Sequence, residues 1–164
     1  MVANFEIVQI ALSEPPEVIK NVLRDNRRCF EDYNFRLIGN QKIIHKEFYD
    51  KIPSGSQWLW LKSDITRFEY LYNCSDVLYL DWEVKINKIP VLKELTWADS
   101  YDYWAIYNHT EHEAFKYILE EGIRRVEKYP SWKKIRKNWL IPFIEEVGGA
   151  VFPRDCFTHK GCYA

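Results

Sequence analysis

The sequence has no apolar run near the roughly 20 residues that a membrane-spanning helix needs, and it carries almost no net charge. With 23 basic and 24 acidic residues, it lacks a global field that would attract nucleic acid or an anionic membrane. Its four cysteines include no C-x-x-C pair, which argues against a zinc knuckle or a thioredoxin-type motif. The N-terminal residues also lack the basic region of a signal peptide. These absences favour a reduced, cytoplasmic protein without a transmembrane segment.

Glycine and proline are few, at 6 and 7 residues, whereas hydrophobic residues make up 47% of the chain and aromatic residues 16%. This composition is typical of a globular protein with a substantial core and not of a disordered one. A chain of 164 residues has the length of one domain, and no repeat, linker or low-complexity tract divides it. We therefore expect a single compact domain over residues 1–164.

The first half of the chain alternates strand and helix patterns. Apolar or alternating runs over residues 5–12 and 34–38 predict strands, and helical patterns over 16–30 and 42–51 follow them. Residues 58–72 carry the clearest amphipathic stripe and predict a longer helix. This alternation favours an α/β fold, a mostly parallel sheet flanked by helices.

The second half begins with a predicted strand over residues 77–86. Thr110 and Glu113 form a capping box before an amphipathic helix, and residues 131–138 predict a further helix that extends no further than Pro142.

Asp81 and Glu83 stand two residues apart at the end of the predicted strand 77–86. Residues two apart in a strand point to the same side, so their carboxylates would lie together. At about 4 Å such charges repel by roughly 1 kcal/mol in water and about 4 kcal/mol at an effective dielectric of 20, so a sheltered pair favours a cation. Mg²⁺ and Mn²⁺ take such oxygen ligands together with substrate phosphates. The alternative is that both acids are simply solvated.

Asp64 and Arg67 are three residues apart on the predicted helix 58–72, with Asp64 at the border of the apolar stripe and Arg67 further out. Taken alone, they form an ordinary surface ion pair. If this helix packs beside the following strand, however, a carboxylate able to accept from a sugar hydroxyl and a guanidinium able to hold phosphate would lie near Asp81 and Glu83.

The segment SDITRFEYLYNCSDVLYLDWEV, residues 63–84, resembles the core of the DXD-containing sugar-nucleotide glycosyltransferases of family 32. That family includes capsular polysaccharide, mannosyl- and galactosyltransferases and is related to the glucosylating clostridial toxins. Its pattern is roughly D-x-x-R-x-x-x-L-Y followed by G-G-x-Y-L-D-x-D. The positions that match are Asp64, Arg67, Leu71, Tyr72, Tyr79, Leu80 and Asp81. The segments IVQIAL, NHTEHEAFKYIL and THKGCYA are similar to the family's first strand, the start of its late helix and its closing H-x-x-G-S-W.

The resemblance implies a Rossmann-like nucleotide-binding domain of the GT-A type that binds a UDP- or GDP-hexose. It implies that Asp81 and Glu83, joined by His159, hold Mn²⁺ or Mg²⁺ at the donor diphosphate. Asp64 and Arg67 would hold the donor sugar. The residues expected near the nucleotide are Ile10, Ala11, Leu12, Tyr79 and Tyr163.

Three parts of the family pattern are changed in this chain. Glu83 replaces the second Asp, Asp76 and Val77 replace the two glycines, and Cys162 and Tyr163 replace Ser-Trp in the tail. The chain is also short for such an enzyme, so we expect its acceptor side to be reduced. A homo-oligomer or a partner would then complete the acceptor site.

The function that the resemblance implies is transfer of a hexose to a carbohydrate or other acceptor, with retention of configuration. One alternative is a metal-dependent nucleotidyl or phosphoryl transfer enzyme, which would use Asp81 and Glu83 but give Asp64 no sugar to bind. Another alternative is a non-catalytic module derived from a transferase that binds carbohydrate or another polymer.

Weaker signals have ordinary structural interpretations. His109 and His112 are three residues apart and do not match H-E-x-x-H, so capping and surface roles are expected. The segment SWKKIRKNW, residues 131–139, suits a phosphorylated acceptor, a membrane surface or nucleic acid, but a helix with buried Trp and wet Lys residues is the commoner case. Trp58, Trp60 and Trp82 are candidates for stacking on a ring, although Trp58 fits the core and Trp82 should pack beneath the sheet.

Overall fold

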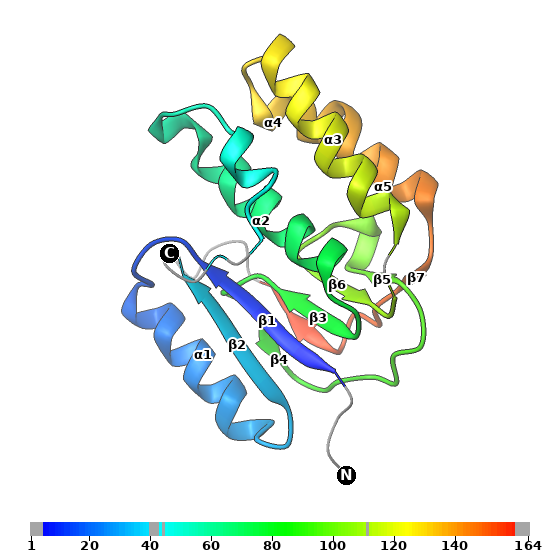
Figure 1. Ribbon diagram of the computed structural model, residues 1–164. Coiled ribbons are helices and arrows are strands. Elements are labelled where there is room, and N and C mark those ends of the chain that lie inside the picture. The colour runs from blue at the N-terminus through cyan, green and yellow to red at the C-terminus, as the bar shows by residue number, and fades with distance from the viewer. Residues whose placement is uncertain (1–4, 40–42, 44, 111, 160–164) are drawn as a thin grey trace.

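The protein is an α/β domain built on a mixed six-stranded sheet, described by a computed structural model over residues 5–39, 43, 45–110 and 112–159 (Figure 1). The strand order is β2-β1-β3-β6-β5-β7, and β6 runs against both neighbours while the other pairs are parallel. The expected α/β fold with a mostly parallel sheet is thereby confirmed. The strands are β1 (Glu6–Ala11), β2 (Asn34–Gly39), β3 (Val77–Leu80), β5 (Thr96–Trp97), β6 (Ala105–Asn108) and β7 (Ala150–Val151).

Helices cover both faces of this sheet (Figure 1). One face carries α2, α3 and the consecutive helical segments near the C-terminus, and the other carries α1 together with a second, two-stranded sheet of β4 and β8. The helices are α1 (Glu17–Cys29), α2 (Leu59–Asn73), α3 (Glu113–Lys128), α4 (Trp132–Ile135), the π-helix η5 (Arg136–Leu140) and α5 (Ile141–Val147), with β4 (Lys85–Ile86) and β8 (Phe157–Thr158). Short 3₁₀ turns are η2 (Tyr49–Lys51), η3 (Ser56–Trp58) and η4 (Asp99–Tyr101). In the described residues, no helix is long and apolar enough to cross a membrane.

The central strands are buried on both sides, which explains their nearly continuous apolar sequence. In β1, Ile7 packs on the face of α1 while Val8 and Ile10 pack beneath α2. The helix α2 is itself buried over most of its circumference, because α3 covers it from outside. Polar residues on α2 are therefore held inside the protein, next to the ends of the strands.

The side chain of Asn26 joins α1 to the small sheet. Its Nδ2 donates to the Val84 carbonyl at 2.9 Å, and its Oδ1 accepts from the Ile86 backbone N–H at 2.9 Å. Asn26 is almost fully buried, so both bonds are made away from water. This helix thus supports the segment that follows β3.

Several sequence-based expectations are corrected. The predicted strand 77–86 is interrupted, because β3 ends at Leu80 and a turn separates it from β4. Of the predicted helix 42–51, the described residues form only the 3₁₀ turn η2. Thr110 does not cap α3, because His112 occupies the N-cap and its Nδ1 accepts from the Ala114 N–H at 3.1 Å. Pro142 does not end a helix, since it lies in the first turn of α5, where its missing N–H is tolerated.

Candidate functional site

A cavity with a volume of about 430 Å³ lies beyond the carboxyl ends of β1 and β3. Ile10 and Leu12 bring the β1 end to it, and Tyr79 and Asp81 bring the β3 end. The other lining residues come from α2, the turn after β3 and the segment before β6; they are Ser13, Leu59, Trp60, Ser63, Asp64, Arg67, Trp82, Glu83, Asp102, Tyr103, Trp104 and Arg136.

The strand order explains why a cavity forms there. The chain leaves β1 through α1 to reach β2 on one side, and α2 then leads to β3 on the other side of β1. The connections after the two adjacent parallel strands therefore diverge, and in open α/β sheets this point is where ligands bind.

Asp81 and Glu83 lie in a turn and not in a strand, so the prediction that they point to the same side of a strand is wrong. The Val84 N–H donates to the Asp81 carbonyl at 3.1 Å, which closes the turn. The Asp81 N–H donates to the Trp104 carbonyl at 2.8 Å, which fixes the beginning of the turn against the strand beside it. Trp82 consequently lies at the cavity, half-buried, and not beneath the sheet.

The carboxylate of Asp81 is held by two side chains. Arg67 donates from Nη2 to Asp81 Oδ1 at 2.8 Å, and Tyr79 donates its hydroxyl to the same oxygen at 2.7 Å. Burial raises the pKa of Asp81 to about 6, although the charge of Arg67 opposes this shift, and repulsion from Glu83 adds to it. Asp81 Oδ2 makes no hydrogen bond within the described residues and is free for a ligand.

Arg67 is buried, with 5% of its surface exposed, and is not the surface residue that its place on the helix suggested. Its guanidinium lies between the rings of Tyr79 and Tyr103, at 4.4 and 4.8 Å from their centroids. Nη1 donates to the Tyr103 carbonyl at 2.9 Å, while Nε has no acceptor in the described structure. Arg67 is therefore a rigid cation beneath Asp81.

Asp64 is also buried, at 6% exposed, and its Oδ2 accepts two hydrogen bonds. The Tyr103 hydroxyl and the Trp132 indole N–H each donate to it at 2.8 Å. Within the described residues, Asp64 Oδ1 makes only the contact with Arg67 at 3.5 Å, which is too long for a strong hydrogen bond. One carboxylate oxygen thus remains for a ligand hydroxyl, whereas the other holds the side chain in place.

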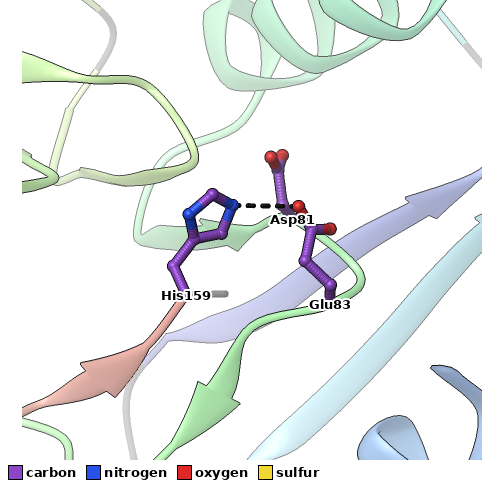
Figure 2. Close-up of side chains that lie close together, drawn as sticks. All are labelled: Asp81, Glu83 and His159. Atoms are coloured by element: carbon purple, nitrogen blue, oxygen red, sulfur yellow. Dashed lines mark hydrogen bonds and ion pairs between the residues drawn. The ribbon is translucent and has the colours of Figure 1, made fainter. Parts of the chain in front are cut away.

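Glu83 and His159 complete a cluster of potential metal ligands with Asp81. One ligand atom from each of the three residues lies within 4.8 Å of the others. Figure 2 shows His159, just after β8, with Nε2 directed at Glu83 Oε1, at 2.9 Å, and the Asp81 carboxylate beside them. The hydrogen bond to Glu83 raises the pKa of His159, whose ring also stacks on Trp104 with centroids 4.6 Å apart.

These donors fit a hard divalent cation with an affinity for one imidazole. Two carboxylates, each with an oxygen free of protein hydrogen bonds in the described residues, suit Mg²⁺ or Mn²⁺, and the imidazole makes Mn²⁺ the better match. Glu83 and His159 would bind the cation in place of their mutual hydrogen bond. The site would keep open positions for ligand oxygens, since three protein ligands do not fill an octahedral shell.

The structure brings together most of the residues that the sequence indicated. Ile10, Leu12, Asp64, Arg67, Tyr79, Asp81 and Glu83 line the cavity, and His159 contacts Glu83. Ala11 is buried within β1 and is not part of the cavity lining. Tyr163 and Cys162 lie outside the described residues. Trp58 is buried in the core as expected, whereas Trp60 is 61% exposed at the cavity.

Sequence reasoning missed the residues that hold the predicted ones in place. Tyr103 and Trp104 belong to the segment before β6, which no periodicity marked, and Trp132 was assigned only to a buried helix face. The indole N–H of Trp132 offered a weak signal, because a buried Trp needs an acceptor. That the acceptor is Asp64 depends on the packing of α4 beside α2.

Comparisons of the chain with family models, curated proteins and solved structures give no match.

Proposed function

We propose that the protein is a metal-dependent glycosyltransferase of the GT-A type, which transfers a hexose from a nucleotide diphosphate sugar to an acceptor hydroxyl. The observation that carries the proposal is the convergence of Asp64, Arg67, Asp81 and Glu83 on one cavity where the connections after β1 and β3 diverge. His159 joins Asp81 and Glu83 in the cluster of potential metal ligands at this cavity. The resemblance of residues 63–84 to family 32 implies donor and metal roles for Asp64, Arg67, Asp81 and Glu83, and the likeness of the tail implies a metal role for His159.

In this reaction the bond between the anomeric carbon and the diphosphate oxygen breaks. A bond forms between the same carbon and the acceptor oxygen, whose proton is released, and the nucleoside diphosphate leaves. When bound, Mn²⁺ or Mg²⁺ supplies positive charge that stabilises the leaving diphosphate.

The chain's own residues orient the reactants. Asp64 Oδ1 accepts a hydrogen bond from a hydroxyl of the donor sugar, because Oδ2 already accepts hydrogen bonds from Tyr103 and Trp132. Arg67 holds Asp81 Oδ1 through Nη2, which leaves the second Asp81 oxygen available to a cation. The cavity of about 430 Å³ has room for a sugar and a diphosphate but remains open, so water has access until an acceptor covers it.

A thermal-shift screen of UDP- and GDP-hexoses, with and without Mn²⁺, tests donor binding. A ligand at 100 times its Kd stabilises the native state by about 2.7 kcal/mol, which raises the Tm by roughly 5–10 °C for a protein of this size. The shift should require both Mn²⁺ and the correct nucleotide. Asp81→Asn should abolish it, while Asp50→Asn, an exposed control on η2, should leave it intact.

Donor hydrolysis separates the proposal from its alternatives. Without an acceptor, water attacks the anomeric carbon, and free hexose and nucleoside diphosphate are released in equal amounts. A nucleotidyl or phosphoryl transfer enzyme would instead release a sugar phosphate or inorganic phosphate. A non-catalytic module would bind the donor without turnover, and either result would exclude transfer by this site.

A further inference from the structure

A basic hollow adjoins the candidate donor site. It has a volume of about 260 Å³ and is lined by Lys133, Arg136 and Lys137 together with Asp102 and Ile141. Arg136 and Asp102 also line the larger cavity, so the two hollows meet at these residues.

The chain path explains why these cations gather there. Trp132 and Ile135 bury one face of α4, which leaves Lys133 exposed on the other. Lys133 and Lys137 are four residues apart, so they share a helix face, and the π-helix η5 begins at Arg136. A π-turn inside a helical segment is often found at functional sites.

These lysines are not neutralised by the protein. In the described part of the chain, no carboxylate lies within ion-pair distance of Lys133 or Lys137, whereas Lys20 and Lys88 each have an acidic partner at 2.6 Å. Asp102 is the single acidic residue of the lining and accepts the Tyr103 N–H at 2.7 Å. Three cations against one carboxylate leave an excess of positive charge in a concave site.

The wall of the donor cavity carries an exposed apolar surface next to Arg136. Trp60 is 61% exposed and Leu59 is 50% exposed, and both line the donor cavity. The guanidinium of Arg136 lies over the Trp60 ring at 5.7 Å from its centroid. A ligand held by the lysines would therefore extend across an aromatic surface towards Asp64 and Asp81.

We propose that this hollow binds a phosphate group carried by the acceptor, and that the acceptor skeleton lies on Trp60 with its reactive hydroxyl in the donor cavity. The inference rests on the proposed function, because it assigns the acceptor side of the same transfer. A phosphate monoester carries about −1.5 to −2 charges at pH 7, which complements the excess positive charge of the lining. Arg136 offers a planar fork of donors to phosphate oxygens, and the two lysines act as point charges.

The concave shape favours a phosphorylated small molecule or headgroup over a polymer. A nucleic acid or a flat membrane surface would need cations spread along an exposed face, whereas Lys133 and Lys137 converge with Arg136 on one hollow. The net charge of −1 also provides no wider attraction.

The test is a calorimetric titration of the full chain with glucose 6-phosphate, glucose and inorganic phosphate, without donor or metal. Glucose 6-phosphate and inorganic phosphate should bind and glucose should not. Lys133→Gln/Lys137→Gln should weaken binding at least tenfold. The matched control is Lys116→Gln/Lys134→Gln, which removes two exposed lysines outside the hollow and should change affinity less than twofold. Equal weakening by the two double variants would overturn the proposal.

Vesicles identify the source of the phosphate. Phosphatidylcholine vesicles with 20% phosphatidylinositol 4-phosphate, whose headgroup carries a phosphate monoester, should retain wild-type protein if the phosphate belongs to a lipid headgroup. Lys133→Gln/Lys137→Gln should then lose retention, and Lys116→Gln/Lys134→Gln should keep it. Loss in both double variants would mean simple surface attraction and would refute the hollow as a site. The hollow is also refuted as a site if the wild type binds neither the soluble phosphates nor the vesicles. It is refuted as well if the wild type binds a DNA oligonucleotide more tightly than glucose 6-phosphate and both double variants weaken that binding equally.

The same variants separate this inference from the proposed function. The Mn²⁺-dependent thermal shift with a nucleotide sugar should be unchanged in Lys133→Gln/Lys137→Gln, because neither lysine lines the donor cavity. If donor binding holds while phosphate binding fails, only the acceptor inference is wrong. A third result is that the wild type binds phosphate, Lys133→Gln/Lys137→Gln does not, and no nucleotide sugar binds. The proposed transfer reaction would then be wrong, whereas the phosphate site would stand.

Discussion

Asp81 is held as a carboxylate in a place that disfavours its charge. Its replacement therefore tests whether the metal-free fold is destabilised by this charge. The side chain is 22% exposed and contacts Arg67 at 2.8 Å, yet burial and Glu83 outweigh this attraction. A neutral side chain of the same shape should therefore be better tolerated by the metal-free fold. We expect Asp81→Asn to stabilise the protein in the absence of metal.

The size of the gain follows from the pKa. Because the folded pKa of Asp81 lies at about 6 and its ordinary value at 3.8, ionisation above pH 7 destabilises the native state by about 3 kcal/mol. Protonation favours the folded state, so wild-type stability falls as pH rises from about 4 to about 6 and then stays level. The advantage of Asp81→Asn should accordingly be about 3 kcal/mol at pH 8 and about half of that at pH 5.

The measurement is urea unfolding of wild type and Asp81→Asn in EDTA, at pH 5, 6, 7 and 8. Adding Mn²⁺ should reverse the order, since the metal stabilises only the protein that retains the ligand. The reasoning would be refuted if Asp81→Asn were less stable by about 3–5 kcal/mol at pH 8, the cost of leaving a buried charge unpaired. That result would mean that the ion pair with Arg67 outweighs the burial of Asp81.

Three further changes test the surroundings of the site. Trp132→Phe removes the indole donor to Asp64 and should cost about 1–3 kcal/mol of stability and weaken donor binding without changing Mn²⁺ affinity, as measured by calorimetry. His159→Ala should weaken Mn²⁺ binding about 10-fold or more, and wild-type Mn²⁺ affinity should fall with decreasing pH as the raised pKa of His159 favours the proton over the metal. Asn26→Ala loses both of its bonds to the segment around β4 and should cost about 2–4 kcal/mol, seen as a lower urea midpoint.

Local patterns were sufficient for the early part of the fold. The predicted strand 5–12 and helix 16–30 correspond to β1 and α1, and the helix 58–72 corresponds to α2, because burial on one or both faces imposes a clear apolar pattern. The strands β5 and β7 have two residues each, too few for any periodicity, and β6 is buried throughout without a bounding turn signal. The sequence also did not indicate that the strand is interrupted at Asp81, because Trp82 and Val84 continue the apolar pattern through the turn.

The candidate site divides in the same way. Asp64, Arg67, Asp81 and Glu83 were indicated by residue type and spacing within 20 residues of sequence, and His159 by likeness of the tail. Their burial was not indicated, and neither was the pairing of Arg67 with Asp81. A helix stripe records which residues are apolar, but it does not record that a second helix, α3, covers the polar side.

By itself the sequence determined which chemical groups are available to the candidate site, since carboxylates, a guanidinium and an imidazole are set by residue identity alone. Only the tertiary structure decided that these groups meet. Trp132 contacts Asp64 across 68 residues, and His159 contacts Glu83 across 76 residues. Such contacts arise when helices pack on a sheet whose strand order places the ends of β1 and β3 side by side, and no local periodicity encodes that order. The basic hollow has the same origin, because Lys133 and Lys137 line a common hollow only where α4 and η5 lie beside Asp102.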